Sequence, residues 1–235
     1  MINRLWLMSV AEATGFFFAL NVLILLGALL AEKVSQRLFS GAPRTPPATS
    51  RELLLASSTV VINSLISVVG WYLWRAGYLR LNRAADALTI LRDTLVLLLT
   101  MDLILYILHR VAHLRWFYNW AHYLHHEFLH VRLLTLFVMH PLEALGFGVL
   151  WVITLSAFAF STESVVIFLQ LNLYFGLAAH CGFSPYPKRL ARAISRLFIA
   201  TPEFHLQHHR RETENLGFYT TLWDRLFRTI SRPEP

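Results

Sequence analysis

The stretch ATGFFFALNVLILLGALLA at residues 13–31 contains no charged side chain. About 20 apolar residues in a helix are enough to cross the hydrocarbon core of a bilayer. A second uncharged stretch, LLLASSTVVINSLISVVGWYLW, follows at residues 53–74. Because lipid offers the backbone no hydrogen-bond partner, each stretch is expected to cross as an α-helix. The sequence therefore predicts an all-α membrane protein.

Three further apolar stretches lie beyond these two. Residues 94–108 form a shorter one that contains Asp102, and residues 144–162 and 164–186 form a hairpin of two spans that only Glu163 separates. A proline-rich connector divides the first two spans. The arginine-containing stretch at residues 75–92 is expected to be an interfacial helix or a loop near the lipid headgroups. We expect a multi-pass transmembrane domain with about four to six membrane segments.

The composition agrees with this architecture. The chain has 235 residues, 56% of them hydrophobic and 15% charged, with a mean hydropathy of +0.49. These values exceed what a soluble globular chain normally carries, and they exclude a disordered chain. The single cysteine, Cys181, excludes an internal disulfide. In a membrane protein, a net charge of +7 indicates cytoplasmic loops beside anionic headgroups, and we expect no nucleic-acid partner.

The distribution of basic residues predicts the orientation. The tail from Lys188 onward is rich in arginine, whereas residues 161–164 contain no basic side chain, which places the tail in the cytoplasm. The four arginines at residues 75–92 would then lie outside, so either one early segment is re-entrant or this stretch is an exception. Because Glu12 interrupts the apolar N-terminus and no small-residue cleavage signature follows, we expect no cleaved signal peptide.

All eleven histidines lie between residues 109 and 209, and eight of them form three close groups. These groups are HRVAH at residues 109–113, HYLHH at residues 122–126 and HLQHH at residues 205–209. Spacings of three and four residues place imidazoles on one face of a helix, where they can reach a common metal ion. The candidate metal ligands are His109, His113, His122, His125, His126, His205, His208 and His209.

The number of histidines favours two metal ions, because eight imidazoles exceed the three or four ligands of a single zinc ion. Each histidine alone could be an ordinary hydrogen-bonded residue. Haem needs only one or two axial ligands, usually on separate helices. A zinc protease of the HExxH type would carry glutamate where Arg110 stands. Adjacent pairs such as His125 and His126 favour a compact cluster of two metals.

In order and spacing, these groups resemble the integral-membrane fatty acid hydroxylase and sterol desaturase superfamily of di-iron enzymes. The resemblance covers residues 102–229 and includes HPLE at residues 140–143, His180, NLGF at residues 215–218 and WDRLF at residues 223–227. It implies a helical membrane domain with a cytosolic helical cap. The cap would carry the three histidine groups, which are called histidine boxes. Residues 1–93 would then supply membrane segments and connectors, and residues 94–235 the catalytic domain.

The same resemblance implies the chemistry. The boxes, together with His180, would hold two iron ions. The enzyme would use O2 and electrons from a ferredoxin- or cytochrome b5-type donor to hydroxylate or desaturate a lipid or sterol C–H bond. The substrate would enter sideways from the bilayer. The boxes would face the cytoplasm, at a bacterial inner membrane or the endoplasmic reticulum.

Several positions depart from the family pattern. The usual serine, asparagine, arginine and glycine are replaced by Glu127, His130, Val138 and Arg228. Gly176 stands where some members have a further histidine, so one ligand is either missing or supplied by water. These changes leave the boxes whole but the substrate class open. Whether His130 and His140 bind metal is also left open.

Asp102 and Tyr106 are the candidate catalytic-site residues beside the metal ligands. With His109 and His113, they fall within about 60° on one helical stripe. A ligating histidine normally donates its second N–H to a carboxylate or carbonyl. We therefore expect Asp102, with Tyr106, to orient a ligating histidine. The alternative is that Asp102 bonds a neighbouring helix or pairs with an arginine.

Two other classes of protein stay open. A non-catalytic membrane metal-binding or transport protein would also need histidines, although it would distribute them along a path through the spans. An inactive member of the same family is the second alternative, against which the intact boxes argue. The lipid, the position oxidised, the electron donor, the oligomeric state and the outcome (alcohol, double bond or ether cleavage) are open at this stage.

Overall fold

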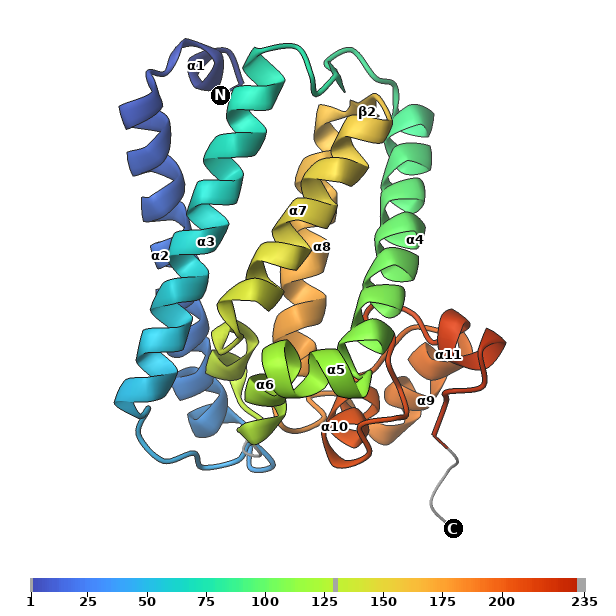
Figure 1. The fold of residues 1–235 in the computed structure, drawn as a ribbon. Helices are drawn as coiled ribbons and strands as arrows, with labels where there is room; N and C mark the ends of the chain where they lie inside the picture. Colours follow the sequence, from blue (N-terminus) through green and yellow to red (C-terminus); the bar gives the residue numbers. More distant parts are fainter. Residues whose placement is uncertain (1, 129–130, 232–235) are drawn as a thin grey trace.

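The computed structural model describes residues 2–128 and 131–231. In this part of the chain, five long helices run between two ends of the molecule and alternate in direction (Figure 1). They are α2 (Val10–Leu38), α3 (Ser50–Arg75), α4 (Ala87–Ala112), α7 (Pro141–Ala157) and α8 (Thr162–Ala179). The predicted all-α class is confirmed. It is supplemented by one parallel pair of two-residue strands, β1 (Leu81–Asn82) and β2 (Phe160–Ser161).

Four of these helices, α2, α3, α4 and α8, are long and apolar enough to cross a membrane, judged by length and composition. The fifth, α7, is apolar but has only 17 residues. Large apolar side chains on the spans point outward: Leu23 is 64% exposed and Leu30 is 63% exposed. Such a surface is suited to contact with lipid. The chain is an integral membrane protein, and its four candidate spans fall within the predicted range.

Polar side chains determine where the first three spans begin. Ser9 and Glu12 form a capping box at the start of α2, and Thr49 and Glu52 form another at the start of α3. At the start of α4, the Thr89 amide donates to the Asp86 carboxylate at 2.8 Å. Each cap satisfies backbone N–H groups that the helix itself leaves free.

The hairpin between α7 and α8 turns earlier than the sequence predicts. Because α7 ends at Ala157 and α8 begins at Thr162, the turn comprises residues 158–161 and Glu163 lies inside α8. Strand β2 lies in this turn and pairs with β1, and the Ser161 amide donates to the Asp93 carboxylate at 2.7 Å. These long-range contacts position the turn. The helix α8 correspondingly ends at Ala179, before the predicted residue 186.

The arginine-containing stretch after α3 forms a loop with the short strand β1, not an interfacial helix. Arg83 lies over the rings of Trp6 and Trp74, at 5.4 and 5.2 Å from the ring centroids. The Arg75 guanidinium donates to the Met8 carbonyl at 2.6 Å. This loop lies at the end of the bundle opposite the short helices that follow α8 (Figure 1). The helices α2, α3 and α4 each run the length of the bundle, so none of these early segments turns back within it (Figure 1).

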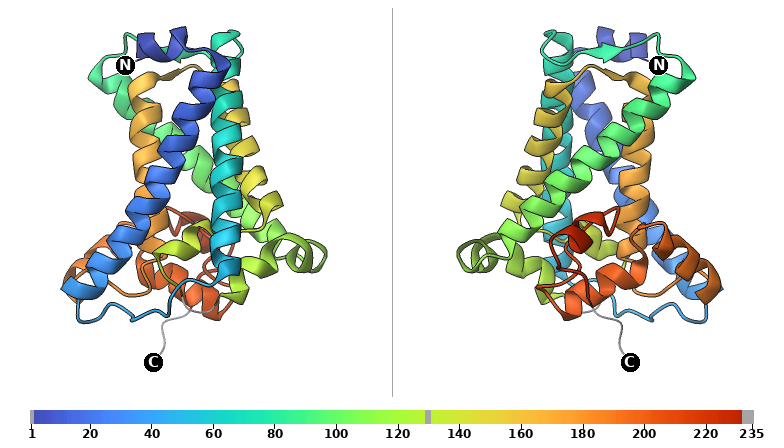
Figure 2. Two further views of the ribbon diagram at one scale, coloured as in Figure 1. Left: turned by 90° about the vertical axis from the view of Figure 1, so that its left-hand side faces the viewer. Right: turned by 90° about the vertical axis from the view of Figure 1, so that its right-hand side faces the viewer.

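The other end of the bundle carries most of the short helices, as both views in Figure 2 show. These are α5 (Arg115–Phe117), the π-helix η1 (Tyr118–His122), α6 (Tyr123–Glu127), the 3-10 helix η2 (Leu133–Phe137), α9 (Lys188–Arg196), α10 (Pro202–Arg210) and α11 (Leu222–Leu226). At the opposite end lies α1 (Ile2–Leu7). One buried apolar core lies among α4, α7 and α8, and a second lies among α2, α3 and η2. The second core attaches η2 to the spans, and the first includes Tyr219 from the segment before α11.

Candidate metal centre

The structure brings all nine predicted ligands together at one end of the bundle. Their ligand nitrogens form two groups, within each of which all atoms lie within 4.8 Å of one another. The first cluster consists of His109, His113, His122, His126 and His208. The second cluster consists of His125, His180, His205 and His209. Eight of the nine side chains are buried, and that of His113 is half-buried.

In the first cluster, the Nε2 atoms of five histidines converge. The Nε2 atom of His122 lies 3.2 Å from that of His109 and 3.1 Å from those of His113 and His126. The Nε2 atom of His208 lies 3.3 Å from that of His126. Nitrogens about 2.1 Å from one ion, and about 90–110° apart around it, lie about 3.0–3.4 Å from each other. The spacing therefore matches a shared metal ion.

The tautomers also indicate a cation. The Nδ1 atom of His109 lies 2.8 Å from the Leu216 carbonyl oxygen, and that of His208 lies 2.8 Å from the Glu214 carbonyl oxygen. A carbonyl oxygen only accepts, so each Nδ1 carries the proton and each Nε2 presents a lone pair. Lone pairs that point at one another repel unless a cation lies between them. The donor set therefore fits a bound metal.

A carboxylate supports a third ligand of the first cluster. The Nδ1 atom of His122 lies 2.8 Å from Glu143 Oε1, and both side chains are more than nine-tenths buried. A carboxylate that accepts the second N–H of a metal-binding histidine orients the ring and makes the other nitrogen a better donor. Glu143 belongs to the predicted HPLE motif, but the sequence did not assign it a role.

The second cluster directly adjoins the first. The Nε2 atom of His205 lies 3.3 Å from that of His180 and 3.1 Å from that of His209. The ring centroids of His126 in the first cluster and His209 in the second are 4.9 Å apart. His180 caps α8 and donates from Nδ1 to the Gly176 carbonyl at 2.8 Å. Within the described residues, the buried Nδ1 atoms of His125 and His209 have no hydrogen-bond partner.

Burial keeps these imidazoles neutral. Loss of hydration lowers the pKa of His125 to about 3 and the pKa of His180 to about 4. Burial, with the neighbouring His122, lowers the pKa of His113 to about 3. For His205 and His208, burial also lowers the pKa well below the ordinary value. Neutral imidazoles have a free nitrogen lone pair, which is the form that binds a metal.

Asp102 and Tyr106 lie close to the first cluster but contact no histidine among the described hydrogen bonds. The Asp102 carboxylate accepts from the Tyr219 amide at 2.8 Å and from the amide and hydroxyl of Thr220. The Tyr106 hydroxyl lies 2.9 Å from the hydroxyl oxygen of Thr229. The expected direct hydrogen bond to a histidine is absent because the segment from Tyr219 to Thr229 occupies these groups. Their part in catalysis stays a prediction.

A loop held by two carboxylates supplies the partner of His109. Asp224 accepts from the amides of Leu216 and Gly217, at 2.7 and 2.8 Å, and Asp102 accepts from the far side of the same loop. The loop in turn presents the Leu216 carbonyl to His109. Both aspartates are fully buried. Their hydrogen bonds reach His109 only through the backbone of this loop.

The structure describes the surroundings of four positions that depart from the family pattern. The Glu127 carboxylate pairs with Arg51 at 2.6 Å, and Val138 is buried in the second apolar core. Arg228 has φ 60°, a left-handed conformation that glycine adopts more easily. A Cβ atom at Gly176 would lie 2.9 Å from the Leu136 side chain.

The sequence leaves metal binding by His130 and His140 open. His140 belongs to neither cluster: its Nδ1 atom accepts from the Leu142 amide at 3.2 Å and caps α7. His130 lies outside the described residues. Sequence reasoning missed Glu143 and the carbonyls of Leu216, Glu214 and Gly176. An acidic residue at the start of an apolar segment was a signal for Glu143, whereas backbone carbonyls leave no signal in a sequence.

The fold and the site together define an integral membrane protein with two adjacent clusters of buried histidines. The profile of the fatty acid hydroxylase family matches residues 94–229. The chain belongs to this family, which confirms the resemblance seen in the sequence.

Several curated proteins are similar to this chain. A cholesterol 25-hydroxylase-like protein of Danio rerio is 26% identical over 167 residues, which cover 70% of this chain and 65% of that protein. Methylsterol monooxygenase 1 of Danio rerio is 32% identical over 127 residues, which cover 54% of this chain and 43% of that protein. Very-long-chain aldehyde decarbonylase GL1-6 of Oryza sativa subsp. indica is 30% identical over 142 residues, which cover 56% of this chain and 22% of that protein. The chain thus spans less than two thirds of each of these proteins. No solved structure matches it.

Proposed function

We propose that this chain is a membrane-bound di-iron oxygenase that uses O2 and external electrons to hydroxylate, or desaturate, a C–H bond of a lipid or sterol. The observation that carries the proposal is the convergence of nine histidines in two adjacent clusters. Imidazole without thiolate suits iron, and nine nitrogens exceed what one tetrahedral zinc ion can use. The names of the relatives support a sterol or long-chain lipid as substrate.

The chemistry that bound iron supplies is activation of O2 for attack on an unactivated C–H bond, with transfer of a hydroxyl group. The chain itself orients the ligands. His109 and His208 each hold a proton on Nδ1, against backbone carbonyls, so that Nε2 points inward. Glu143 does the same for His122. Burial of the clusters excludes bulk water, which protects a reactive site from side reactions.

The position of the site supports a substrate that enters from the bilayer and a donor that docks from the aqueous side. The clusters lie where the candidate spans α4 and α8 end, so a membrane-dissolved lipid can approach without crossing water. The helix α9, at the same end, exposes Lys188, Arg189, Arg192 and Arg196. We infer that this end faces the cytoplasm, because basic residues concentrate there. Its charge suits an acidic electron donor of the ferredoxin or cytochrome b5 type.

Metal analysis tests the proposal. We expect detergent-purified protein, expressed with ample iron, to contain close to two irons per chain by mass spectrometry. The double variant His125→Ala/His208→Ala removes one ligand from each cluster and is expected to fall to about one iron per chain or less, because the second cluster keeps only three nitrogens. His140→Asn is the matched control, because His140 lies outside both clusters and asparagine keeps the helix cap. Protein without bound transition metal would refute the di-iron assignment.

A non-catalytic metal-binding or transport protein is the competing function. The iron-loaded protein, given a chemical reductant and O2, is expected to incorporate oxygen from labelled O2 into extracted membrane lipids or sterols. Retention of two irons with no O2-dependent lipid product, in the presence of donor proteins of both types, would favour the competing function.

A further inference from the structure

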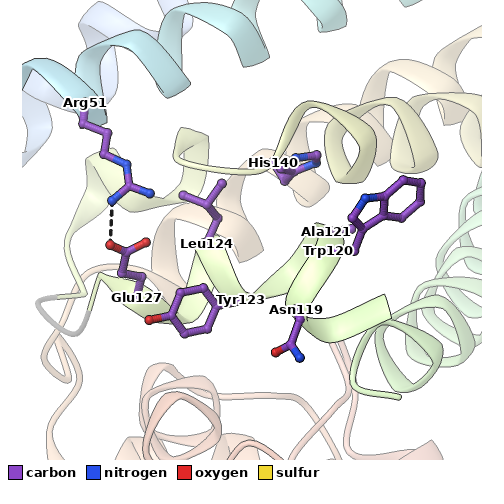
Figure 3. A pocket seen from close by; sticks show the side chains of 8 residues that line it. All are labelled: Arg51, Asn119, Trp120, Ala121, Tyr123, Leu124, Glu127 and His140. Carbon is purple, nitrogen blue, oxygen red and sulfur yellow. Dashed lines mark hydrogen bonds and ion pairs between the residues drawn. The ribbon is translucent and has the colours of Figure 1, made fainter. Parts of the chain in front are cut away.

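A cavity of about 260 Å³ lies on the side of α6 that faces away from the histidine clusters. Figure 3 shows that its side chains come from three places: Arg51 from the start of α3, His140 from the start of α7, and the rest from η1 and α6. Neither metal cluster contributes a residue. The proposed oxygenase reaction assigns no role to this cavity.

The cavity lies at the level where the membrane helices end. Arg51 is the second residue of α3, and His140 is the cap of α7. Two aromatic residues also line the cavity: Trp120 is 67% exposed and Tyr123 is 50% exposed. Tryptophan and tyrosine concentrate at the boundary between hydrocarbon and water, where an amphipathic ring is stable. The cavity therefore faces the headgroup layer of the bilayer.

The polar groups of the cavity carry opposite charges side by side. Arg51 Nη1 lies 2.6 Å from Glu127 Oε1, and the two side chains are 57% and 31% exposed. A guanidinium has five N–H donors, and only one of them is used by Arg51 in the hydrogen bonds found among the described residues. In Figure 3 this pair lies on one side of the cavity and Trp120 lies on the other, with Tyr123 between. The site thus offers hydrogen-bond donors, a carboxylate and two aromatic rings.

We propose that this cavity binds the zwitterionic headgroup of a bilayer phospholipid. The phosphate accepts from Arg51, and the cationic amine lies between Glu127 and the rings of Trp120 and Tyr123. Aromatic faces attract ammonium groups, and a guanidinium forms paired hydrogen bonds with phosphate oxygens. An anionic headgroup that lacks the amine is disfavoured, because Glu127 repels its uncompensated charge.

The size of the cavity supports a headgroup. Its volume of about 260 Å³ lies below the roughly 300–1,000 Å³ of pockets that enclose a whole drug-sized ligand, which fits a headgroup whose chains stay outside. The acyl chains would lie outside the cavity, along the spans. Leu54 on α3 is 69% exposed and Leu145 on α7 is 42% exposed, and both begin the apolar surface next to the cavity.

The bound lipid would support the second histidine box from outside. Glu127 and Tyr123 lie on the same five-residue helix as His125 and His126. The ion pair between Glu127 and Arg51 already ties this short helix to α3, and a headgroup that contacts both side chains would add to this connection. This role concerns the stability of the box and does not depend on the identity of the oxygenase substrate.

Native mass spectrometry of delipidated protein in a non-ionic detergent tests the proposal. The probes are phosphatidylethanolamine, phosphatidylcholine, phosphatidylglycerol and diacylglycerol with identical acyl chains. We expect the two zwitterionic lipids to form a one-to-one complex at concentrations about tenfold lower than the other two. The double variant Arg51→Gln/Glu127→Gln is expected to lose this preference, whereas Arg80→Gln, at the opposite end of the bundle, keeps it.

Unchanged preference in the double variant, or equal binding of all four lipids by the wild type, would overturn the proposal. Tighter binding of phosphatidylglycerol would identify a simple anion site instead. A circular dichroism spectrum and a gel-filtration profile equal to those of the wild type show that a variant is folded. If the double variant does not fold, Trp120→Ala serves in its place: it keeps the ion pair and is expected to weaken phosphatidylcholine binding several-fold. No change in that variant would also count against the site.

Discussion

The two histidine clusters use the same side chain but hold it differently. The first has five converging nitrogens, and three of its rings are anchored through Nδ1, by Leu216, Glu143 and Glu214. The second has four nitrogens. There, the Nδ1 atom of His180 hydrogen-bonds to the Gly176 carbonyl, and those of His125 and His209 have no hydrogen-bond partner among the described residues. In the first cluster, the Nδ1 atom of His126 also has none within the described part of the chain.

This difference suggests a division of roles between the two metal positions. Anchored rings form a preorganised site, which holds a metal tightly and changes little during a reaction. A site with fewer protein ligands leaves a coordination position for water or a substrate molecule, as catalytic metal sites do. We infer that the second cluster is the one that exchanges an external ligand.

The largest expected effect is the loss of metal on removal of one ligand, and it should differ between the clusters. His209→Ala leaves three nitrogens in the second cluster, whereas His208→Ala leaves four in the first. We therefore expect His209→Ala to fall to about one iron per chain, while His208→Ala retains close to two, since four ligands form a complete site. Mass spectrometry of the purified variants measures this. Equal losses in the two variants would contradict the division of roles.

A smaller effect is expected from removal of the carboxylate that anchors His122. Glu143→Ala leaves the His122 Nδ1 proton without its acceptor, and loss of such a partner typically costs about 10–100-fold in metal affinity. Glu143→Gln keeps an acceptor oxygen and should restore part of the affinity. Release of iron to a chelator, followed with time, measures the change. Release from the second cluster should stay at the wild-type rate; faster release from both would show a general loss of structure.

The spans and eight of the nine candidate ligands could be predicted because both depend on local patterns, whereas His180 came only from the family resemblance. A run of about 20 apolar residues is a property of composition, and spacings of three and four residues are a property of the helix. The division of the ligands could not be predicted. In the second box, His122 and His126 enter the first cluster and His125 enters the second. Neighbouring imidazoles on a helix point about 100° apart, so one box serves both metal positions.

The anchoring groups escaped prediction for a different reason. Asp102 lies on the predicted helical stripe, yet its carboxylate is occupied by the amides of Tyr219 and Thr220, more than a hundred residues away in sequence. Leu216 contributes a carbonyl, which any residue would provide. The hairpin turn was misplaced because the contact between β1 and β2 joins distant segments. Such contacts arise only when the chain is folded.

Loss of the Asp102 carboxylate is expected to have a moderate effect, confined to the first cluster. Asp102→Asn cannot accept all the hydrogen bonds from Tyr219 and Thr220, and a buried group left unpaired costs about 1–3 kcal/mol. The loop that presents Leu216 to His109 should loosen as a result. We expect a lower unfolding temperature and faster release of iron from the first cluster only. A variant with wild-type stability and iron release would show that Asp102 does not position this site.

The smallest effect is expected where the second cluster is made to resemble the first. Gly176 lies one helical turn before His180, on the same face of α8. In Gly176→His, a fifth imidazole would reach the second cluster and occupy the position left for an external ligand. We expect iron to be released a few-fold more slowly and azide, monitored by absorption, to bind more weakly. Gly176→Ala controls for crowding, because its Cβ atom would meet only the flexible end of the Leu136 side chain, at 2.9 Å. Azide binding as strong as in the wild type, with both irons present, would place the exchangeable position elsewhere.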